Sequence, residues 1–422
     1  MQYIRKVLKN GMKIIVVPMK GNPTATVFVL VEAGSKYEKK ENNGISHFLE
    51  HVCFKGTLRR PKAADISKEL DNIGAHYNAF TSQEYTGYYA KADYKSFDKI
   101  LDVISDMYIN PTFSEGEIEK EKGVIIEEIN MYLDLPQHIV VNEFNKLLYG
   151  DKPAGWDIAG PKENIQKMRR QDFIDYRNKH YVSSATTVIV AGKIDEKEVF
   201  KKVSNAFRDI GKWKKEGKDK VIENQKQPQA TVYFKDTDQT HIVLGVRTFN
   251  TYNKYNSIIR LIEAILSGGM SSRLFQKMRD EMGICYYVRA DNEALTDHGV
   301  FAVSAGLDSK RVKEGIVAIL NELKKIKTEI ISKEELDKAK QYLIGNLYLG
   351  LESSDSLATF YGYQEVLRKD LKKPEDVVKE IKAVTAEEIK FVAEKIFKDE
   401  SLNLSMVGKF TDKKEFLEIL KL

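Results

Sequence analysis

Two histidines and a glutamate stand close together in the string His47-Phe48-Leu49-Glu50-His51. On a helix, His47 and His51 are four residues apart, so both imidazoles project from one face. This spacing is typical of two nitrogen ligands on one zinc ion. Glu50 lies at the edge of the same face, where its carboxylate can take a proton from a water molecule that the zinc activates. The order H-x-x-E-H is the inverse of the H-E-x-x-H zinc motif.

A catalytic zinc needs a third protein ligand, which must come from elsewhere in the chain. The segment 114–133 is expected to form a helix, and it carries Glu121, Glu127 and Glu128. Glu121 and Glu128 are seven residues apart and flank the apolar stripe of this helix, whereas Glu127 points to the opposite side. A carboxylate beside a buried stripe is costly unless a metal or hydrogen bonds satisfy it. The geometry favours Glu128 as the ligand and Glu127 as a solvent residue, with an ordinary solvated helix edge as the alternative for Glu121 and Glu128.

The elements that must position these residues alternate between strands and helices. Segments 12–17 and 25–32 are rich in Ile, Val and Phe, and both are predicted to be strands. The histidine pair is predicted to lie on a short helix at 46–54, and strand character returns at 76–90. Strands and helices mixed in this way predict an α+β fold.

The order of elements recurs after a charged, Lys-rich stretch at 212–228. Three landmarks repeat at similar offsets: Gly192 with Gly408, Ser114 with Ser332, and Gly44 with Gly269. We therefore expect two related domains of mixed β-sheet packed with helices and joined by a charged linker. The zinc-bearing catalytic domain would span 1–211, the linker 212–228, and the second domain 229–422. In that alignment Ser272 stands opposite His47, so the second domain lacks metal ligands.

Composition excludes several classes of protein. The 422 residues include 67 Lys and Arg against 62 Asp and Glu, a net charge of +5, which argues against a nucleic-acid binder. No apolar run approaches the roughly 20 residues of a membrane span. Two cysteines, Cys53 and Cys285, exclude a disulfide framework and favour a reducing compartment. We expect a cytoplasmic protein that binds neither nucleic acid nor membrane.

The string HFLEHVCFKGT at 47–57, followed by Glu121 and Glu128, resembles the pitrilysin/insulysin family of zinc metallopeptidases. That family includes insulin-degrading enzyme and the mitochondrial processing peptidase, and this chain is similar to the short, two-domain processing-peptidase branch. The resemblance implies one zinc ion per chain. It assigns zinc ligands at His47, His51 and Glu128, a general base at Glu50, and a supporting residue at Glu121.

Further motifs extend the resemblance. Asn78-Ala79-Phe80-Thr81 resembles the N-A-x-T strand of the family, whose edge pairs with an extended substrate. Asn78, Ala79 and Phe80 are therefore implied to bind substrate, with Phe80 helping to wall the site. An ordinary strand is the alternative interpretation of these residues.

In the second half, Arg279 and Tyr286 resemble an Arg/Tyr pair that holds the substrate carbonyl in relatives. The Tyr could donate a hydrogen bond to the developing oxyanion. Tyr287 is the rival for this role, although the spacing from Arg279 favours Tyr286.

The resemblance implies a zinc-dependent endopeptidase that hydrolyses peptides or unfolded segments, bound in an extended conformation inside a clamshell chamber. Because long members of the family fuse two such units, a homodimer is expected here, with Arg279 and Tyr286 acting on the zinc site of the other protomer. One alternative is a non-catalytic scaffold or partner subunit of a processing-peptidase-like complex. Another is a heterodimer in which a separate chain supplies the Arg/Tyr pair.

Overall fold

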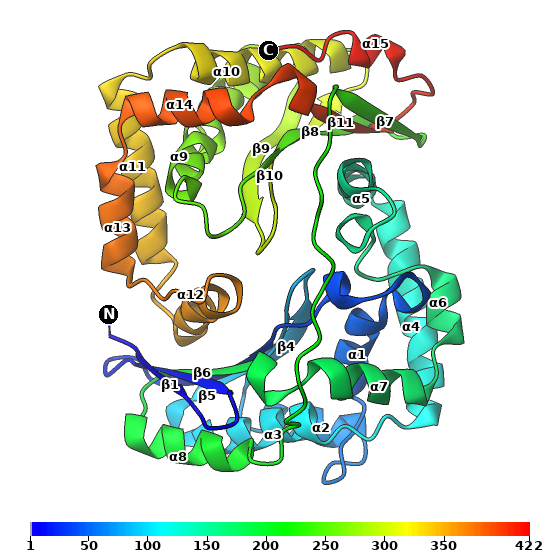
Figure 1. Ribbon diagram of the computed structural model, residues 1–422, viewed down its shortest axis with the longest axis vertical. Coiled ribbons are helices and arrows are strands. Elements are labelled where there is room, and N and C mark those ends of the chain that lie inside the picture. The colour runs from blue at the N-terminus through cyan, green and yellow to red at the C-terminus, as the bar shows by residue number, and fades with distance from the viewer. Residues whose placement is uncertain (1) are drawn as a thin grey trace. The chain divides into compact units, whose positions relative to one another are not determined.

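The computed structural model describes residues 2–422, which divide into two compact units (Figure 1). Unit 1 comprises Met1–Asn130, Trp156–Asp219 and Leu349–Lys373. Unit 2 comprises Met131–Gly155, Lys220–Tyr348 and Pro374–Leu422. Each unit combines helices with one mixed β-sheet, as the predicted α+β class requires.

Unit 1 contains a six-stranded sheet in the order β1-β2-β6-β3-β5-β4. Its strands are β1 (Ile4–Val7), β2 (Lys13–Pro18), β3 (Thr24–Val31), β4 (His76–Thr81), β5 (Thr86–Asp93) and β6 (Thr186–Gly192). β2 and β6 are parallel, and the other neighbours are antiparallel. β4 therefore forms one edge of this sheet.

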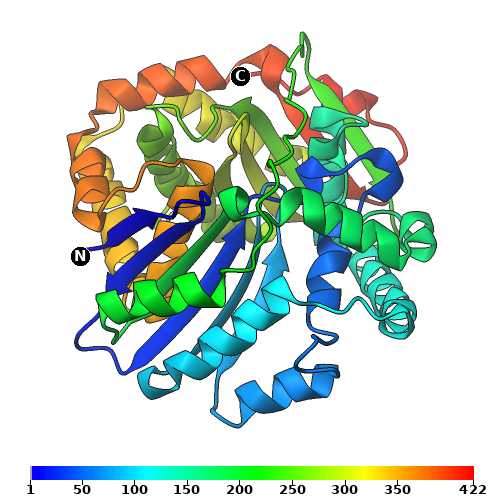
Figure 2. The ribbon, with the colours of Figure 1, turned by 60° about the horizontal axis from the view of Figure 1, so that its bottom comes forward.

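Helices of unit 1 cover both faces of the sheet. They are α1 (Ile45–Cys53), α2 (Ala63–Asp71), α3 (Phe97–Ile109), most of α4 (Glu115–Asp134), α6 (Lys162–Lys167), α7 (Arg170–His180), α8 (Glu196–Ala206) and α12 (Ser354–Leu367). Apolar residues of α1, α3 and α8 share one core with inward-facing residues of the strands. Figure 2 shows α3 and α8 lying over the face of the sheet that packs against this core, and in Figure 1 α12 lies over the opposite face.

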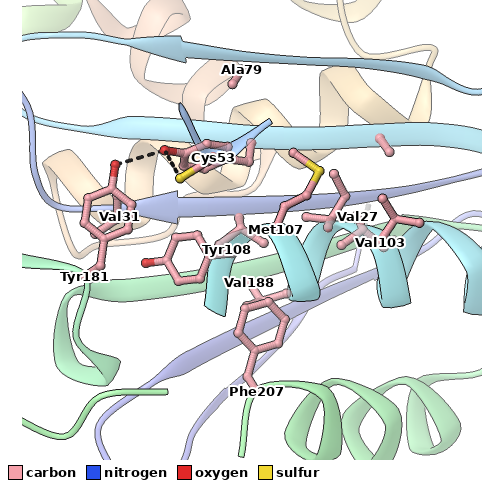
Figure 3. Close-up of a cluster of buried hydrophobic side chains, with 14 of the residues drawn as sticks. Val27, Val31, Cys53, Ala79, Val103, Met107, Tyr108, Tyr181, Val188 and Phe207 are labelled. Atoms are coloured by element: carbon pink, nitrogen blue, oxygen red, sulfur yellow. Dashed lines mark hydrogen bonds between the residues drawn. The ribbon is translucent and has the colours of Figure 1, made fainter. Parts of the chain in front are cut away.

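The C-terminal end of α1 is fixed inside this core. Cys53 is fully buried, and the Tyr88 hydroxyl lies 3.7 Å from its Sγ atom (Figure 3). The same hydroxyl lies 3.0 Å from that of Tyr181, which is itself buried. Helix α1 is thus held on its inner side by close packing, which restricts where its outer side chains can lie.

Unit 2 contains a five-stranded sheet in the order β7-β11-β8-β10-β9. Its strands are β7 (Gln229–Phe234), β8 (Gln239–Thr248), β9 (Cys285–Ala294), β10 (Gly299–Asp308) and β11 (Asn403–Gly408). Its helices are α5 (Pro136–Tyr149), α9 (Asn256–Ser267), α10 (Val312–Thr328), most of α11 (Lys333–Leu349), α13 (Pro374–Ala383), α14 (Ala386–Ile396), α15 (Lys414–Leu417) and a π-helical segment, Phe275–Glu281. β7 and β11 are parallel while the other pairs are antiparallel, so this sheet repeats β2-β6-β3-β5-β4 in order and direction. The predicted pair of related domains is confirmed.

The compact units differ from the continuous ranges 1–211 and 229–422 in two places. The segment with α5 belongs to unit 2, and the segment with α12 belongs to unit 1. Apolar residues of α5 pack with Val243 and Val407 of the second sheet. Gly362 of α12 lies so near the first sheet that an added Cβ would meet Leu30 at 2.7 Å. Sequence order cannot show this exchange, because an apolar helix face does not specify which sheet it covers.

Residues 212–228, the predicted linker, form neither helix nor strand, and the division between the two compact units falls within this stretch, between Asp219 and Lys220. The start of this stretch is nevertheless tied to unit 1, because Lys215 pairs with the buried carboxylate of Glu32. Among residues 2–422, no helix combines the length and the apolar character needed to cross a membrane.

Candidate metal centre

Helix α1 presents the histidine pair because its two sides differ in chemistry. Its inner side consists of apolar residues at helical spacing, all at most 1% exposed: Ile45, Phe48, Leu49, Val52 and Cys53. His47, Glu50 and His51 occupy the other side and are partly buried. The predicted helix at 46–54 is thus confirmed to within one residue.

The N-terminal end of α1 is held by a residue that the sequence analysis missed. The carboxylate of Glu38 accepts hydrogen bonds from the backbone N–H groups of Gly44 and Ser46, each at 2.8 Å. The Asn43 amide donates a third, also at 2.8 Å. Burial raises the pKa of Glu38 to about 7, although these hydrogen bonds oppose the shift. An acceptor at the first turn of a helix satisfies N–H groups that have no partner within the helix.

Helix α4 lies beside α1 and carries the predicted acidic residues (Figure 1). Glu121 is buried, Glu128 is partly buried and Glu127 is exposed. Glu127 therefore lies on the solvent side of α4, apart from Glu121 and Glu128, as predicted from the apolar stripe of this helix.

Three potential ligand atoms converge between α1 and α4. Atoms of His47, His51 and Glu128 all lie within 4.8 Å of one another. Oε2 of Glu128 is 3.7 Å from Nε2 of His47 and 3.5 Å from Nε2 of His51. In a tetrahedral zinc site with bonds of about 2.1 Å, ligand atoms are about 3.4 Å apart. The donor set of two imidazoles and one carboxylate, and its spacing, fit a zinc ion with a fourth position left for water.

The surroundings of the two imidazoles differ. Nδ1 of His51 is 2.9 Å from Oε1 of Glu121, so this nitrogen carries the proton and Nε2 is directed toward Glu128. Nδ1 of His47 is buried, and within residues 2–422 it has no hydrogen-bond partner. Burial and the neighbouring His51 lower the pKa of His47 to about 4, which keeps this imidazole neutral, as metal binding requires.

The charges around His51 raise its pKa, in contrast to the lowered pKa of His47. Burial alone would lower the pKa of His51, but the hydrogen bond to Glu121 and the nearby carboxylates raise it. Burial likewise works to raise the pKa of Glu121, while hydrogen bonds from His51 and Lys55 lower it overall. Glu121 is therefore ionised at neutral pH and able to accept a hydrogen bond from the Nδ1–H group of His51.

Glu50 has a partner that the sequence analysis did not assign to it. Oγ1 of Thr81 donates a hydrogen bond of 2.5 Å to Oε2 of Glu50. Burial raises the pKa of Glu50, while this hydrogen bond and the charge of His51 oppose the increase. Thr81 is the last residue of the N-A-x-T string, but no local pattern indicated that its hydroxyl contacts a residue of α1.

Asn78, Ala79 and Phe80 lie on the edge strand β4, which, within the described residues 2–422, pairs only with β5. Ala79 faces the core that contains α1, in the same alternation as Thr81. Phe80 points to the other face of the sheet, where its ring centroid is 6.3 Å from that of Tyr363 on α12. Their part in substrate binding remains a prediction.

Arg279 and Tyr286 lie in unit 2, at the π-helical segment and the start of β9. The Arg279 guanidinium lies 5.4 Å from the centroid of the Tyr286 ring, which is 72% exposed. In β9, Cys285 and Tyr287 pair with successive residues of β10, so Tyr286 is the extra residue of a β-bulge. The Tyr287 hydroxyl instead forms a hydrogen bond of 3.0 Å with Nδ1 of His241. This contrast favours Tyr286 over Tyr287 as the outward-pointing residue.

Comparisons with known proteins give two family matches and several similar proteins. The profile described as insulinase (peptidase family M16) matches residues 13–162, and the peptidase M16 inactive domain matches residues 167–343. The "Uncharacterized zinc protease YmxG" of Bacillus subtilis is 32% identical over 404 residues, which cover 94% of this chain and 96% of that protein. The chain belongs to peptidase family M16. An "Uncharacterized zinc protease" of Rickettsia felis is also 32% identical to this M16 family member, over 92% of the chain and 94% of the relative.

Two solved structures share the fold of this chain. A protease from Helicobacter pylori superposes with a TM-score of 0.90 at 25% identity, covering 96% of this chain and 99% of the other. A peptidase M16 inactive domain from Pseudomonas fluorescens reaches 0.90 at 16% identity over 98% of this chain and all of its own, and it supports the fold alone. All the proposed metal residues of this M16 family member lie within the insulinase match, whereas Arg279 and Tyr286 lie within the inactive-domain match.

Proposed function

We propose that this protein is a zinc-dependent endopeptidase that binds one zinc ion per chain and hydrolyses peptides or unfolded segments. One observation carries the proposal: ligand atoms of His47, His51 and Glu128 converge within 4.8 Å, beside the carboxylate of Glu50. Membership of a peptidase family, and relatives named zinc proteases, support the same class of reaction.

His47, His51 and Glu128 would hold the zinc ion, which would supply a Lewis acid to polarise the scissile carbonyl and to lower the pKa of a water molecule to about 7. Glu50 takes a proton from the attacking water as the oxygen bonds to the carbonyl carbon. It then delivers that proton to the amine nitrogen as the C–N bond breaks. Thr81 holds Oε2 of Glu50, which leaves Oε1 to carry the proton.

The substrate is proposed to bind as an extended strand along the free edge of β4, where Asn78, Ala79 and Phe80 lie. An edge strand offers unpaired backbone N–H and C=O groups to such a segment. A folded protein cannot easily present an extended strand, so peptides and unfolded segments are the substrate class.

The main experiment measures cleavage of an unstructured, quenched-fluorescent peptide before and after removal of metal with a chelator. We expect activity to vanish and to return when zinc is restored. E50Q should bind zinc without cleaving peptide. E128Q should lose zinc, while the matched variant E127Q should keep both zinc and activity, because Glu127 is exposed. Folded, zinc-loaded protein that cleaves no peptide would instead support a scaffold or partner subunit.

We also propose that the protein acts as a homodimer in which Arg279 and Tyr286 complete the metal site of the other protomer. Two inactive variants, E50Q and R279A, would then complement each other. After subunit exchange, an equimolar mixture should recover about one quarter of wild-type activity, since half the dimers are mixed and each has one intact site. No recovery, together with an active monomer in sedimentation, would rule out this arrangement. A partner chain co-purifying from native cells would point to a heterodimer.

The cytoplasm is the proposed compartment, because Cys53 and Cys285 are both free thiols in the structure. Cell fractionation with an antibody against the protein tests this assignment.

A further inference from the structure

We propose that Lys55 is a positioning residue for the metal centre and that it acts by holding the Glu121 carboxylate against His51. The inference rests on the zinc site proposed above and adds a residue outside the set of ligands. Lys55 lies four residues beyond His51, where its backbone N–H continues the helical turn by donating to the Val52 carbonyl at 3.1 Å.

The two oxygens of Glu121 have different partners. Nζ of Lys55 lies 2.6 Å from Oε2, and Nδ1 of His51 lies 2.9 Å from Oε1. The final torsion of a glutamate side chain is broad, so one hydrogen bond alone leaves the carboxylate plane free to turn. Contacts to both oxygens fix that plane and keep Oε1 facing the imidazole.

Burial makes this ion pair different from an ordinary surface pair. The Glu121 side chain is 5% exposed and that of Lys55 is 27% exposed. Exposed ion pairs contribute little, whereas a buried carboxylate that loses its partner is left with an unpaired oxygen that little water can reach. Without Lys55, the unpaired oxygen of Glu121 would favour a rotation of the carboxylate toward solvent and away from His51.

The orientation of His51 depends on Glu121. A carboxylate that accepts the Nδ1 proton fixes the tautomer and the ring plane of a metal-binding histidine, and loss of such a partner weakens metal binding about 10- to 100-fold. Here Nε2 of His51 must stay near Oε2 of Glu128, 3.5 Å away. Lys55 thus supports a metal ligand through one intermediate side chain.

The charge of Lys55, taken alone, predicts the opposite effect on zinc affinity from the one that its positioning role predicts. A lysine ammonium repels a nearby divalent cation, so if charge alone mattered, its removal would tighten zinc binding. The two explanations therefore differ in sign. K55M removes charge and donor, K55Q removes the charge but keeps a donor, and K55R keeps both.

The test measures zinc affinity of the full-length protein by competition with a chromophoric chelator. We expect K55M to bind zinc about tenfold more weakly, at the low end of the range for a partner of a ligand. K55R should restore affinity to near the wild-type value, and K55Q should fall between them. The matched control is K120M on α4, because the Lys120 side chain is 74% exposed and pairs with Glu117 at 2.7 Å, away from the metal centre's side chains. Zinc binding by K55M that is unchanged or tighter would overturn the proposal.

A double-mutant cycle tests whether Lys55 acts through Glu121. In an E121Q background, K55M should cause little further loss of zinc affinity, because the carboxylate it positions is gone. Additive losses would show that Lys55 acts by another route and would contradict the inference. Circular dichroism of each metal-free variant checks folding. Wild-type protein that binds no zinc would refute the proposed function, whereas normal wild-type binding with an unaffected K55M refutes only the role of Lys55.

Discussion

Replacing Thr81 with Val tests how Glu50, the proposed general base, is held in place. Val is nearly isosteric with Thr but lacks the hydroxyl that donates to Oε2 of Glu50 at 2.5 Å. Hydrogen bonds of this length to an ionised carboxylate contribute about 1.5–3 kcal/mol. If that energy holds Glu50 in its reactive position, its loss lowers kcat by about ten- to a hundredfold.

The assay is the peptide cleavage described above, at saturating zinc and across a range of pH. T81V should bind zinc as wild type does, because Thr81 contacts the proposed base Glu50, whereas the proposed metal ligands are His47, His51 and Glu128. Burial already raises the pKa of Glu50, and the Thr81 hydrogen bond opposes that increase. Its removal should therefore move the acidic limb of kcat/KM to higher pH, because Glu50 must be ionised to accept a proton.

T81S provides the matched control, since it keeps the hydroxyl and loses only a methyl group. We expect T81S to retain most of the wild-type kcat. A T81V enzyme with wild-type kcat and an unchanged acidic limb would refute the argument that Thr81 positions Glu50. A T81V protein that also lost zinc would show instead that the substitution disturbs the whole site.

Three further predictions concern stability and assembly. The folded-state pKa of Glu38 is raised from 4.5 to about 7, so the folded protein holds this proton more tightly than the unfolded chain does. As the pH rises from about 4.5 to 7, the unfolding free energy of wild type should therefore fall by about 3 kcal/mol relative to that of E38Q, as measured by denaturant titration. A difference in unfolding free energy between wild type and E38Q that does not change with pH would contradict this prediction. G44A should destabilise the protein by about 3 kcal/mol, because Gly44 has a φ of +100° and an added Cβ would lie 2.6 Å from the Ala159 carbonyl oxygen. An unchanged thermal midpoint would refute that estimate. Finally, recovery of activity on mixing E50Q with R279A tests the homodimer.

Local spacing explains what the sequence could determine. Positions four residues apart on a helix share a face, so the string from His47 to His51 was enough to propose a metal pair. The stripe of α4 likewise separated Glu127 from its neighbours Glu121 and Glu128. The repeated order of strands and helices predicted two related α+β domains because it depends on hydrophobic patterning along the chain.

Tertiary structure decided the contacts between residues far apart in sequence. Thr81 meets Glu50 across 31 residues, and Glu121 meets His51 across 70. Such pairs depend on how α1 packs against β4 and α4, which no local pattern of polar and apolar residues specifies. The exchange of α5 and α12 between units has the same cause, since an apolar helix face fits any sheet of suitable shape. The sequence thus named the proposed ligands and the proposed base, while only packing revealed the contacts of Glu38, Thr81 and Lys55 with α1, Glu50 and Glu121.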